Sequence, residues 1–174
     1  LADYQAFCRR VFKQAGLQVG WSARPKEGHL DALLRSTLLG ALGAYGDEDT
    51  LAQAGELFAS YREDHASVHP NIRAVVLNLA AKRGDRSTFD ALWQLHRNAT
   101  MEEDRVRLLA ALTHIEVPQL LEETLERSLS DKVRVHNTVR MVTGTASNLQ
   151  GLDRAWEFVK GNWAELDRRY GEGG

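Results

Sequence analysis

One histidine pair and one histidine–glutamate motif are the residues whose spacing could suggest a metal site. His65 and His69 are four residues apart, so on a helix both imidazoles would lie on one side. Pro70 follows directly, however, and no glutamate follows His65 as the zinc-binding pattern His-Glu-x-x-His requires. The acid of His114-Ile115-Glu116 comes one position late for that pattern. We therefore expect His65 and His69 to be exposed loop residues, and we predict no metal or other cofactor in this chain.

Nucleophilic and phosphate-binding motifs are also missing from the sequence. It contains no Gly-x-Ser-x-Gly elbow and no Gly-x-x-x-x-Gly-Lys loop. Cys8 lies on a predicted amphipathic face, where a lone cysteine usually packs as a small apolar residue. The carboxylate pairs Glu102-Glu103 and Glu122-Glu123 are expected on solvated helix surfaces. We predict no catalytic residue here, and a self-contained helical hydrolase is the least favoured alternative.

The basic segment over 131–140 is the remaining place where a ligand could bind. Composition alone favours an ordinary exposed helix face there. The sharper hypothesis is that the segment lines the concave wall of a helical array, where a fixed guanidinium could receive a carboxylate. We therefore name Arg134, Asn137 and Arg140 as candidate substrate-binding residues.

Composition restricts the possible classes of protein. The 174 residues are 43% hydrophobic and 26% charged, which is typical of a soluble globular protein. The net charge is −2, from 22 basic and 24 acidic residues spread evenly along the chain, so we expect no nucleic-acid partner. No apolar run approaches the ~20 residues that span a bilayer, and no signal peptide is recognisable, so we expect no membrane partner. With its single cysteine, the chain is expected to be cytoplasmic.

Apolar residues recur at helical spacing along the whole chain, and no period-two alternation persists. In the stripe from Leu30 to Leu42 and the stripe from Leu152 to Tyr170 we expect a buried face, and we expect all four tryptophans to pack in the core or between helices. The pattern predicts about nine helices, roughly over 2–15, 29–45, 48–63, 70–83, 86–98, 101–114, 118–129, 132–145 and 151–170.

Residues typical of helix ends agree with this division. Gly46-Asp47 and Gly84-Asp85 each combine a helix-ending glycine with a capping aspartate. Thr100 and Glu103 have the spacing of a capping box, and Pro118 suits a first helical turn.

A weak internal repeat relates two parts of the chain. The segment from Gly46 to Leu51 realigns on the segment from Gly84 to Phe89, 38 residues later. A period of this length, with two helices per unit, is typical of HEAT or armadillo repeats. We predict an all-α fold, an α-solenoid of antiparallel helix hairpins, with a compact helical bundle as the alternative. The expected domain is a single helical-repeat segment over 1–174.

Two segments carry a family resemblance. The first runs from Gly20-Trp21 through Glu27 to Arg35, and the second holds Val133-Arg134, Thr138-Val139 and then Ala155-Trp156 to Tyr170 with Asn162-Trp163. Both resemble the C-terminal domain of puromycin-sensitive-type aminopeptidases, zinc enzymes related to aminopeptidase N, over essentially the whole chain. The sequence departs from that family at His136-Asn137, where the family pattern has Gln-Asp.

The resemblance implies a division of labour. In that family a separate catalytic domain carries the zinc and its His-Glu-x-x-His motif, which is missing here, so no catalytic residue can be carried over. The C-terminal domain is a HEAT-like bowl over the active site that encloses a substrate chamber. The chain begins at Leu1 within a helical pattern and stops at Gly174, so we expect it to be a domain segment truncated at both ends.

Two hypotheses follow from these observations. In the first, the segment is a non-catalytic wall of the substrate chamber of a zinc aminopeptidase, and its partners are the catalytic domain of the same polypeptide and peptide substrates. In the second, it is a free-standing HEAT-like scaffold that binds a protein on its concave face. The presence of His-Glu-x-x-His in the flanking coding sequence would distinguish them.

Overall fold

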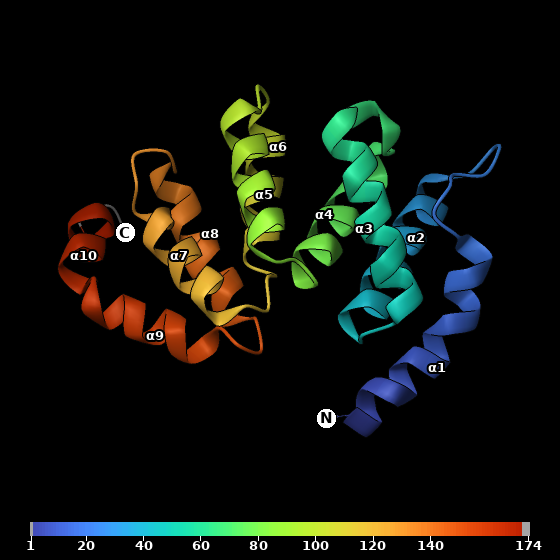
Figure 1. Ribbon diagram of the computed structural model, residues 1–174, viewed down its shortest axis with the longest axis horizontal. Helices are drawn as coiled ribbons and strands as arrows, with labels where there is room; N and C mark the ends of the chain where they lie inside the picture. Colours follow the sequence, from blue (N-terminus) through green and yellow to red (C-terminus); the bar gives the residue numbers. More distant parts are fainter. Residues whose placement is uncertain (1, 172–174) are drawn as a thin grey trace. The chain divides into compact units, whose positions relative to one another are not determined.

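The computed structural model describes residues 2–171, and the regular secondary structure of this part of the chain is helical (Figure 1). It contains no β-strand, which confirms the prediction of an all-α fold. None of its helices is both long enough and apolar enough to cross a membrane. The elements are α1 (Ala2–Val19), α2 (His29–Ala44), α3 (Glu48–Glu63), the 3-10 helix η1 (His65–Ser67), α4 (Pro70–Lys82), α5 (Arg86–Asn98), α6 (Glu102–Leu112), α7 (Pro118–Ser128), α8 (Val135–Ala146), α9 (Leu152–Gly161) and α10 (Trp163–Tyr170).

Three helix boundaries differ from the prediction. Helix α1 extends to Val19, and α8 begins at Val135. The single helix expected over 151–170 is two helices, because the chain bends at Asn162, whose Nδ2 donates to the backbone oxygen of Phe158 over 2.9 Å. The described part of the chain therefore has ten α-helices where about nine were expected.

Most of the predicted helix caps are confirmed, and one is wrong. Asp47 and Asp85 cap α3 and α5 by accepting from backbone N–H groups of the first turn, and Pro118 opens α7. Gly46 has a φ of +78°, a left-handed conformation that glycine adopts at little cost. The capping box at Thr100 is wrong, because α6 begins one residue later with Met101 at the N-cap and no side-chain cap.

The chain divides into two compact units, residues 1–80 and 81–174. In the first unit, α1 packs on α2 and α2 on α3. Leu51 and Ala54 of α3 meet Leu79 of α4 in a buried cluster that Trp21 covers. Helix α2 approaches the same leucine closely: a Cβ on Gly43 would lie 2.4 Å from the Leu79 Cδ2 atom, so this contact requires glycine.

Helix α2 buries only part of the predicted stripe: Leu38 and Leu42 are buried as expected, but the leucines of its first turns are not. Leu30, Leu33 and Leu34 are 77%, 55% and 49% exposed, while Arg35 is buried. Because α2 carries apolar residues on several sides, periodicity alone does not select the buried one. The Arg35 guanidinium meets a complete set of acceptors: Nε donates to the backbone oxygen of Gly20 over 3.0 Å, and both terminal nitrogens donate to Glu27.

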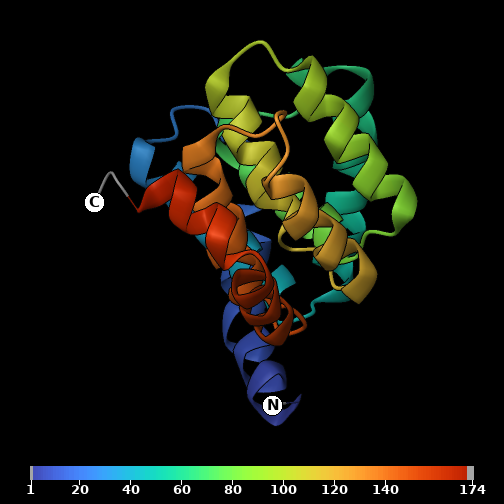
Figure 2. The ribbon, with the colours of Figure 1, turned by 90° about the vertical axis from the view of Figure 1, so that its left-hand side faces the viewer.

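The second unit consists of stacked helix hairpins. Helices α5 and α6 pair, α7 and α8 pair, and the two pairs pack through α6 and α8, which is solenoid-like stacking. Helix α9 packs on both α7 and α8, as Figure 2 shows with α9 and α10 in red and α7 and α8 in orange. The core is mainly aliphatic around one aromatic ring, with its largest fully buried side chains at Phe89, Leu92, Leu108, Leu112, Ile115, Leu121, Leu125 and Met141.

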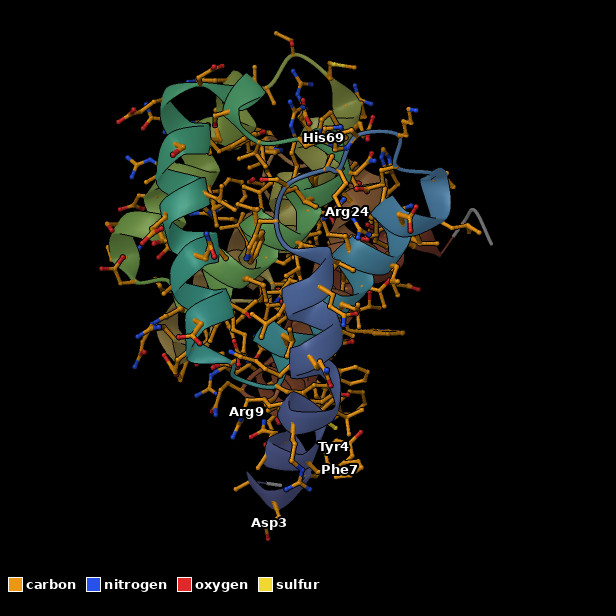
Figure 3. All side chains as sticks on the ribbon, turned by 90° about the vertical axis from the view of Figure 1, so that its right-hand side faces the viewer. Asp3, Tyr4, Phe7, Arg9, Arg24 and His69 are labelled. Atoms are coloured by element: carbon orange, nitrogen blue, oxygen red, sulfur yellow. The ribbon has the colours of Figure 1, made fainter. Side chains whose placement is uncertain are left out.

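Some predicted core residues face solvent. Trp156 and Trp163 are 60% and 63% exposed, and of the stripe from Leu152 to Tyr170 only Ala155 is buried. Val159, Leu166 and Tyr170 of the same stripe are half-buried, so the stripe is partly covered although both tryptophans are exposed. In the first unit, Tyr4 and Phe7 of α1 are likewise exposed (Figure 3). The other two tryptophans pack as predicted, with Trp93 buried and Trp21 against the α3–α4 cluster.

Candidate ligand-binding site

The predicted residues Arg134 and Asn137 lie in one pocket of the second unit. The pocket has a volume of about 340 Å³. It is formed by the end of α5, the start of α6, the loop before α8 and the first turn of α8. Its lining residues are His96, Arg97, Glu102, Arg105, Lys132, Arg134 and Asn137.

The backbone fixes Arg134 at the mouth of this pocket. Val133, the residue before it, is 4% exposed and anchors the loop in the core. Arg134 is the N-cap of α8, and its backbone oxygen accepts from the Asn137 N–H over 2.8 Å. The Arg134 side chain remains 60% exposed, and its Nη1 lies 3.3 Å from Glu102 Oε2. A guanidinium with a fixed base and a solvated head can therefore receive an anion here.

Positive charge dominates the pocket. Four cationic side chains line it against the single carboxylate of Glu102. Arg105 is held in place because its Nε donates to the backbone oxygen of Ala99 over 2.9 Å. Like charges gathered around one carboxylate attract a further anion, and arginine is well suited to bind a carboxylate through two parallel hydrogen bonds.

The floor of the pocket is polar, buried and incompletely hydrogen-bonded. His96 is 6% exposed and Asn137 is 3% exposed, yet His96 Nδ1 and Asn137 Oδ1 have no hydrogen-bond partner. Burial, and then the nearby Arg105 charge, lower the pKa of His96, so its imidazole is neutral at pH 7. Buried polar atoms are nearly always paired, so two unpaired ones in one pocket indicate a place for a ligand.

Arg140, the third predicted residue, lies outside this pocket. It lines a neighbouring hollow of about 360 Å³ together with Asn137, His114 and Ser147. Asn137 therefore borders both hollows, and the three predicted residues do not share one site. Whether Arg140 contacts substrate stays a prediction.

Sequence reasoning missed half of the pocket. His96 has the helical spacing of a buried stripe with Phe89, Leu92 and Trp93, which gives no indication of a ligand site, and Glu102 is expected on a solvated surface. Arg97 and Arg105 also went unnoticed, because they lie about 30 residues before Arg134 in the sequence. The available indication was local: four charged or titratable side chains, at 96, 97, 102 and 105, surround one short helix connection.

No metal site is present in the described residues. They contain no group of three or more histidine, cysteine, aspartate or glutamate side chains placed to hold an ion. His65 and His69 are exposed, as predicted, although His65 begins the 3-10 helix η1. The His65 ring stacks on Tyr61 with centroids 4.5 Å apart, and His69 Nδ1 accepts from the Asn71 N–H over 3.3 Å. The residues present here therefore do not fit zinc.

Two other hollows in this unit differ from the cationic pocket. The larger, about 570 Å³, is lined by four carboxylates and by Arg154, whose Nε donates to Glu122 Oε1 over 3.0 Å. None of the unpaired buried atoms found in the described residues lies in it. The other is an apolar groove of about 390 Å³ between α8, α9 and α10, lined mainly by Val139, Val142, Val159, Trp163, Leu166 and Tyr170.

Comparison with known proteins gives a consistent result. The family model described as "ERAP1-like C-terminal domain" matches residues 1–174. Aminopeptidase M1 of Arabidopsis thaliana is 28% identical, over 94% of this chain and 19% of its own length. Aminopeptidase M1-A of Oryza sativa subsp. japonica is 31% identical, over 84% of this chain and 17% of its own length.

Puromycin-sensitive aminopeptidase of Caenorhabditis elegans is 24% identical, over 93% of this chain and 17% of its own length. The chain thus spans less than a fifth of the length of these relatives.

Proposed function

Because the chain belongs to the ERAP1-like C-terminal domain family, we propose that it is a non-catalytic part of the C-terminal domain of a zinc-dependent aminopeptidase. The reactive groups and the zinc would lie in a separate catalytic domain of the same polypeptide, since the described residues do not fit a metal ion. The reaction of that domain is the release of N-terminal residues from peptides. This segment encloses the substrate chamber and limits access to it.

A chamber wall of this kind contributes through confinement and positioning. It excludes bulk water from the bound peptide and restricts the size of substrate that can enter. It can also hold the end of the peptide that does not react, so that binding energy far from the scissile bond helps to orient the substrate.

The observation that carries this proposal is the cationic pocket of the second unit. Arg134 presents a solvated guanidinium beside the buried polar groups of His96 and Asn137. A peptide substrate has one fixed negative charge at the end opposite to the one that is cleaved, its C-terminal carboxylate. We assign Arg134 as the cation that binds this carboxylate, Asn137 as a substrate-binding residue whose Oδ1 can accept from a neighbouring N–H of the peptide, and Arg140 as a second cation nearby.

The proposal is tested with Arg134→Ala in the full-length enzyme. The KM for long peptides should rise about threefold to tenfold, because a hydrogen bond to a charged group is lost. The KM for a single-residue chromogenic substrate should not change, because that substrate cannot reach the pocket. Arg168→Ala is the matched control: Arg168 is exposed and pairs with Glu165 on α10, away from the pocket. Unchanged kinetics for both substrates would remove the role of Arg134.

The apolar groove between α8, α9 and α10 favours a second function, that of a scaffold that binds a protein partner. An exposed tryptophan in an apolar groove is a common anchor for protein contacts. This alternative predicts no His-Glu-x-x-His motif in the flanking coding sequence, whereas the aminopeptidase proposal requires one upstream.

A further inference from the structure

Glu102 holds an unusual position at the centre of the cationic pocket. It is the first residue of α6, and its side chain is 37% exposed as a whole. Both of its carboxylate oxygens are nevertheless inaccessible to solvent and have no hydrogen-bond partner. The cations around it have taken these oxygens out of water without forming hydrogen bonds to them.

The distances show how weak these contacts are. Arg134 Nη1 is 3.3 Å from Glu102 Oε2, and Arg105 Nη1 is 3.9 Å from the same oxygen. His136 Nε2 is 3.9 Å from Oε1. Charge-assisted hydrogen bonds between a cation and a carboxylate are about 2.7–2.9 Å long. The glutamate therefore loses its hydration and gains only loose electrostatic contact in return.

We infer that the Glu102 carboxylate fills the anion-binding position between the cations of this pocket. A ligand carboxylate then displaces Glu102 and binds in the same position. This inference rests on the proposed function and adds to it a residue that sets the affinity of the site. The class of ligand is a carboxylate with an N–H donor close to it, such as the C-terminal residue of a peptide. The carboxylate meets Arg134 and Arg105, and the N–H can reach the unpaired Asn137 Oδ1.

The position of Glu102 at the start of a helix favours its displacement. Met101, the N-cap before Glu102, is 61% exposed, so the connection that carries the glutamate lies at the surface. Once released, the Glu102 carboxylate regains water and stays at the N-terminus of α6, where a negative charge is favourable. The ligand in turn supplies hydrogen bonds that the pocket lacks without it.

Glu102→Gln tests this inference by removing the competing charge. Its matched control is Glu103→Gln, because Glu103 is the next residue of the same helix turn but pairs with Arg107 and does not line the pocket. Both variants change the net charge and the charge near the helix N-terminus equally. Glu102→Ala serves as a second variant that removes the side chain altogether.

The measurement is the Kd of the full chain for an N-acetylated nonapeptide with a free C-terminal carboxylate, and for the same peptide with a C-terminal amide. Isothermal titration calorimetry gives both values. Glu102→Gln and Glu102→Ala should bind the free acid about two- to fivefold more tightly than the wild type, the gain expected when a weak ion pair no longer competes with the ligand. Glu103→Gln should match the wild type, and the amide should bind weakly to all of them.

The outcomes separate this inference from the proposed function. Unchanged or weaker binding of the acid by both Glu102 variants, with binding lost in Arg134→Ala, overturns the displacement and leaves the carboxylate site in place. Equal gains in Glu102→Gln and Glu103→Gln also overturn it, because general charge would then explain the effect. Equal binding of acid and amide by every variant overturns both the displacement and the proposed carboxylate site.

Discussion

Each of the two units contains an arginine beside a glutamate, and the two pairs are used differently. In the first unit, the Arg35 and Glu27 side chains are 3% and 7% exposed. In the second, those of Arg134 and Glu102 are 60% and 37% exposed. The chemical groups are the same, so the difference lies in their surroundings.

Hydrogen bonding distinguishes the pairs more clearly than exposure does. Arg35 donates to Glu27 and to the backbone oxygens of Val19 and Gly20, and Glu27 Oε2 also accepts from the Arg24 N–H over 2.8 Å. This network closes the loop between α1 and α2. A fully satisfied pair of this kind has no capacity left for a ligand, so its role is structural.

The pair in the second unit is incomplete. Neither oxygen of Glu102 receives a hydrogen bond, and the neighbouring His96 and Asn137 each keep an unpaired buried atom. An incomplete polar cluster is costly for folding and is tolerated where a ligand completes it. Unmet hydrogen bonds therefore single out Arg134 as the candidate for ligand binding, which charge alone does not do.

Substitution of the two arginines should affect the stability of the protein very differently. Arg35→Ala should lower the free energy of unfolding by about 3 kcal/mol, because it leaves a buried carboxylate without its partner. Arg134→Ala should change it by less than about 0.5 kcal/mol, as expected for an exposed ion pair. Urea unfolding of both variants measures the contrast. Equal losses of unfolding free energy in the two variants would contradict this prediction.

The dependence of stability on pH should also reflect the ionisation of Glu27. Hydrogen bonds from Arg35, and then from the Arg24 backbone, lower the pKa of Glu27 from 4.5 to about 2. Because the folded state then binds this proton less readily than the unfolded state, the stability from Glu27 is complete above its unfolded pKa. It is lost as the pH falls from 4.5 towards 2.

Glu27→Gln should therefore flatten the fall of the urea midpoint between about pH 5 and about pH 2. Glu63→Gln, which removes the same charge from an exposed position at the end of α3, is the control and should keep the wild-type slope. An unchanged slope in Glu27→Gln would show that other carboxylates carry the acid sensitivity.

Smaller changes in stability are expected at two adjacent residues of α8. Thr138 Oγ1 donates to the backbone oxygen of Ser128 over 2.7 Å, so Thr138→Val should cost about 1 kcal/mol. Asn137 has an unpaired oxygen, so Asn137→Leu should cost nothing or stabilise by up to about 1 kcal/mol, at the expense of ligand binding. Thermal unfolding measures both. A clear loss in Asn137→Leu would mean that its amide is needed for folding and is not kept for a ligand.

Much of the fold followed from local patterns. The caps at Asp47 and Asp85 and the start of α7 at Pro118 depend on side chains within one helical turn, so the sequence predicts them. The failure at Thr100 is also local, since Met101 adopts the extended conformation that the N-cap needs. The break at Asn162 was missed because the apolar stripe continues through it.

The candidate site was predicted only in part. Arg134 and Asn137 were found because they lie in one short basic segment that also carries the family resemblance. His96 and Glu102 come from a different hairpin, and no sequence spacing relates them to Arg134. Only the packing of α6 against α8 brings the two segments together.

The helices, most of their ends and the family follow from the amino-acid sequence alone, since these depend on neighbouring residues and on recurring motifs. Which arginine is buried and which stays exposed depends instead on how the helices pack. Whether a guanidinium is satisfied depends on acceptors supplied by distant segments: the carbonyls of Val19 and Gly20 for Arg35, and the start of α6 for Arg134. Helical periodicity does not predict these contacts, because they form between segments that are distant in the sequence and meet only when the helices pack.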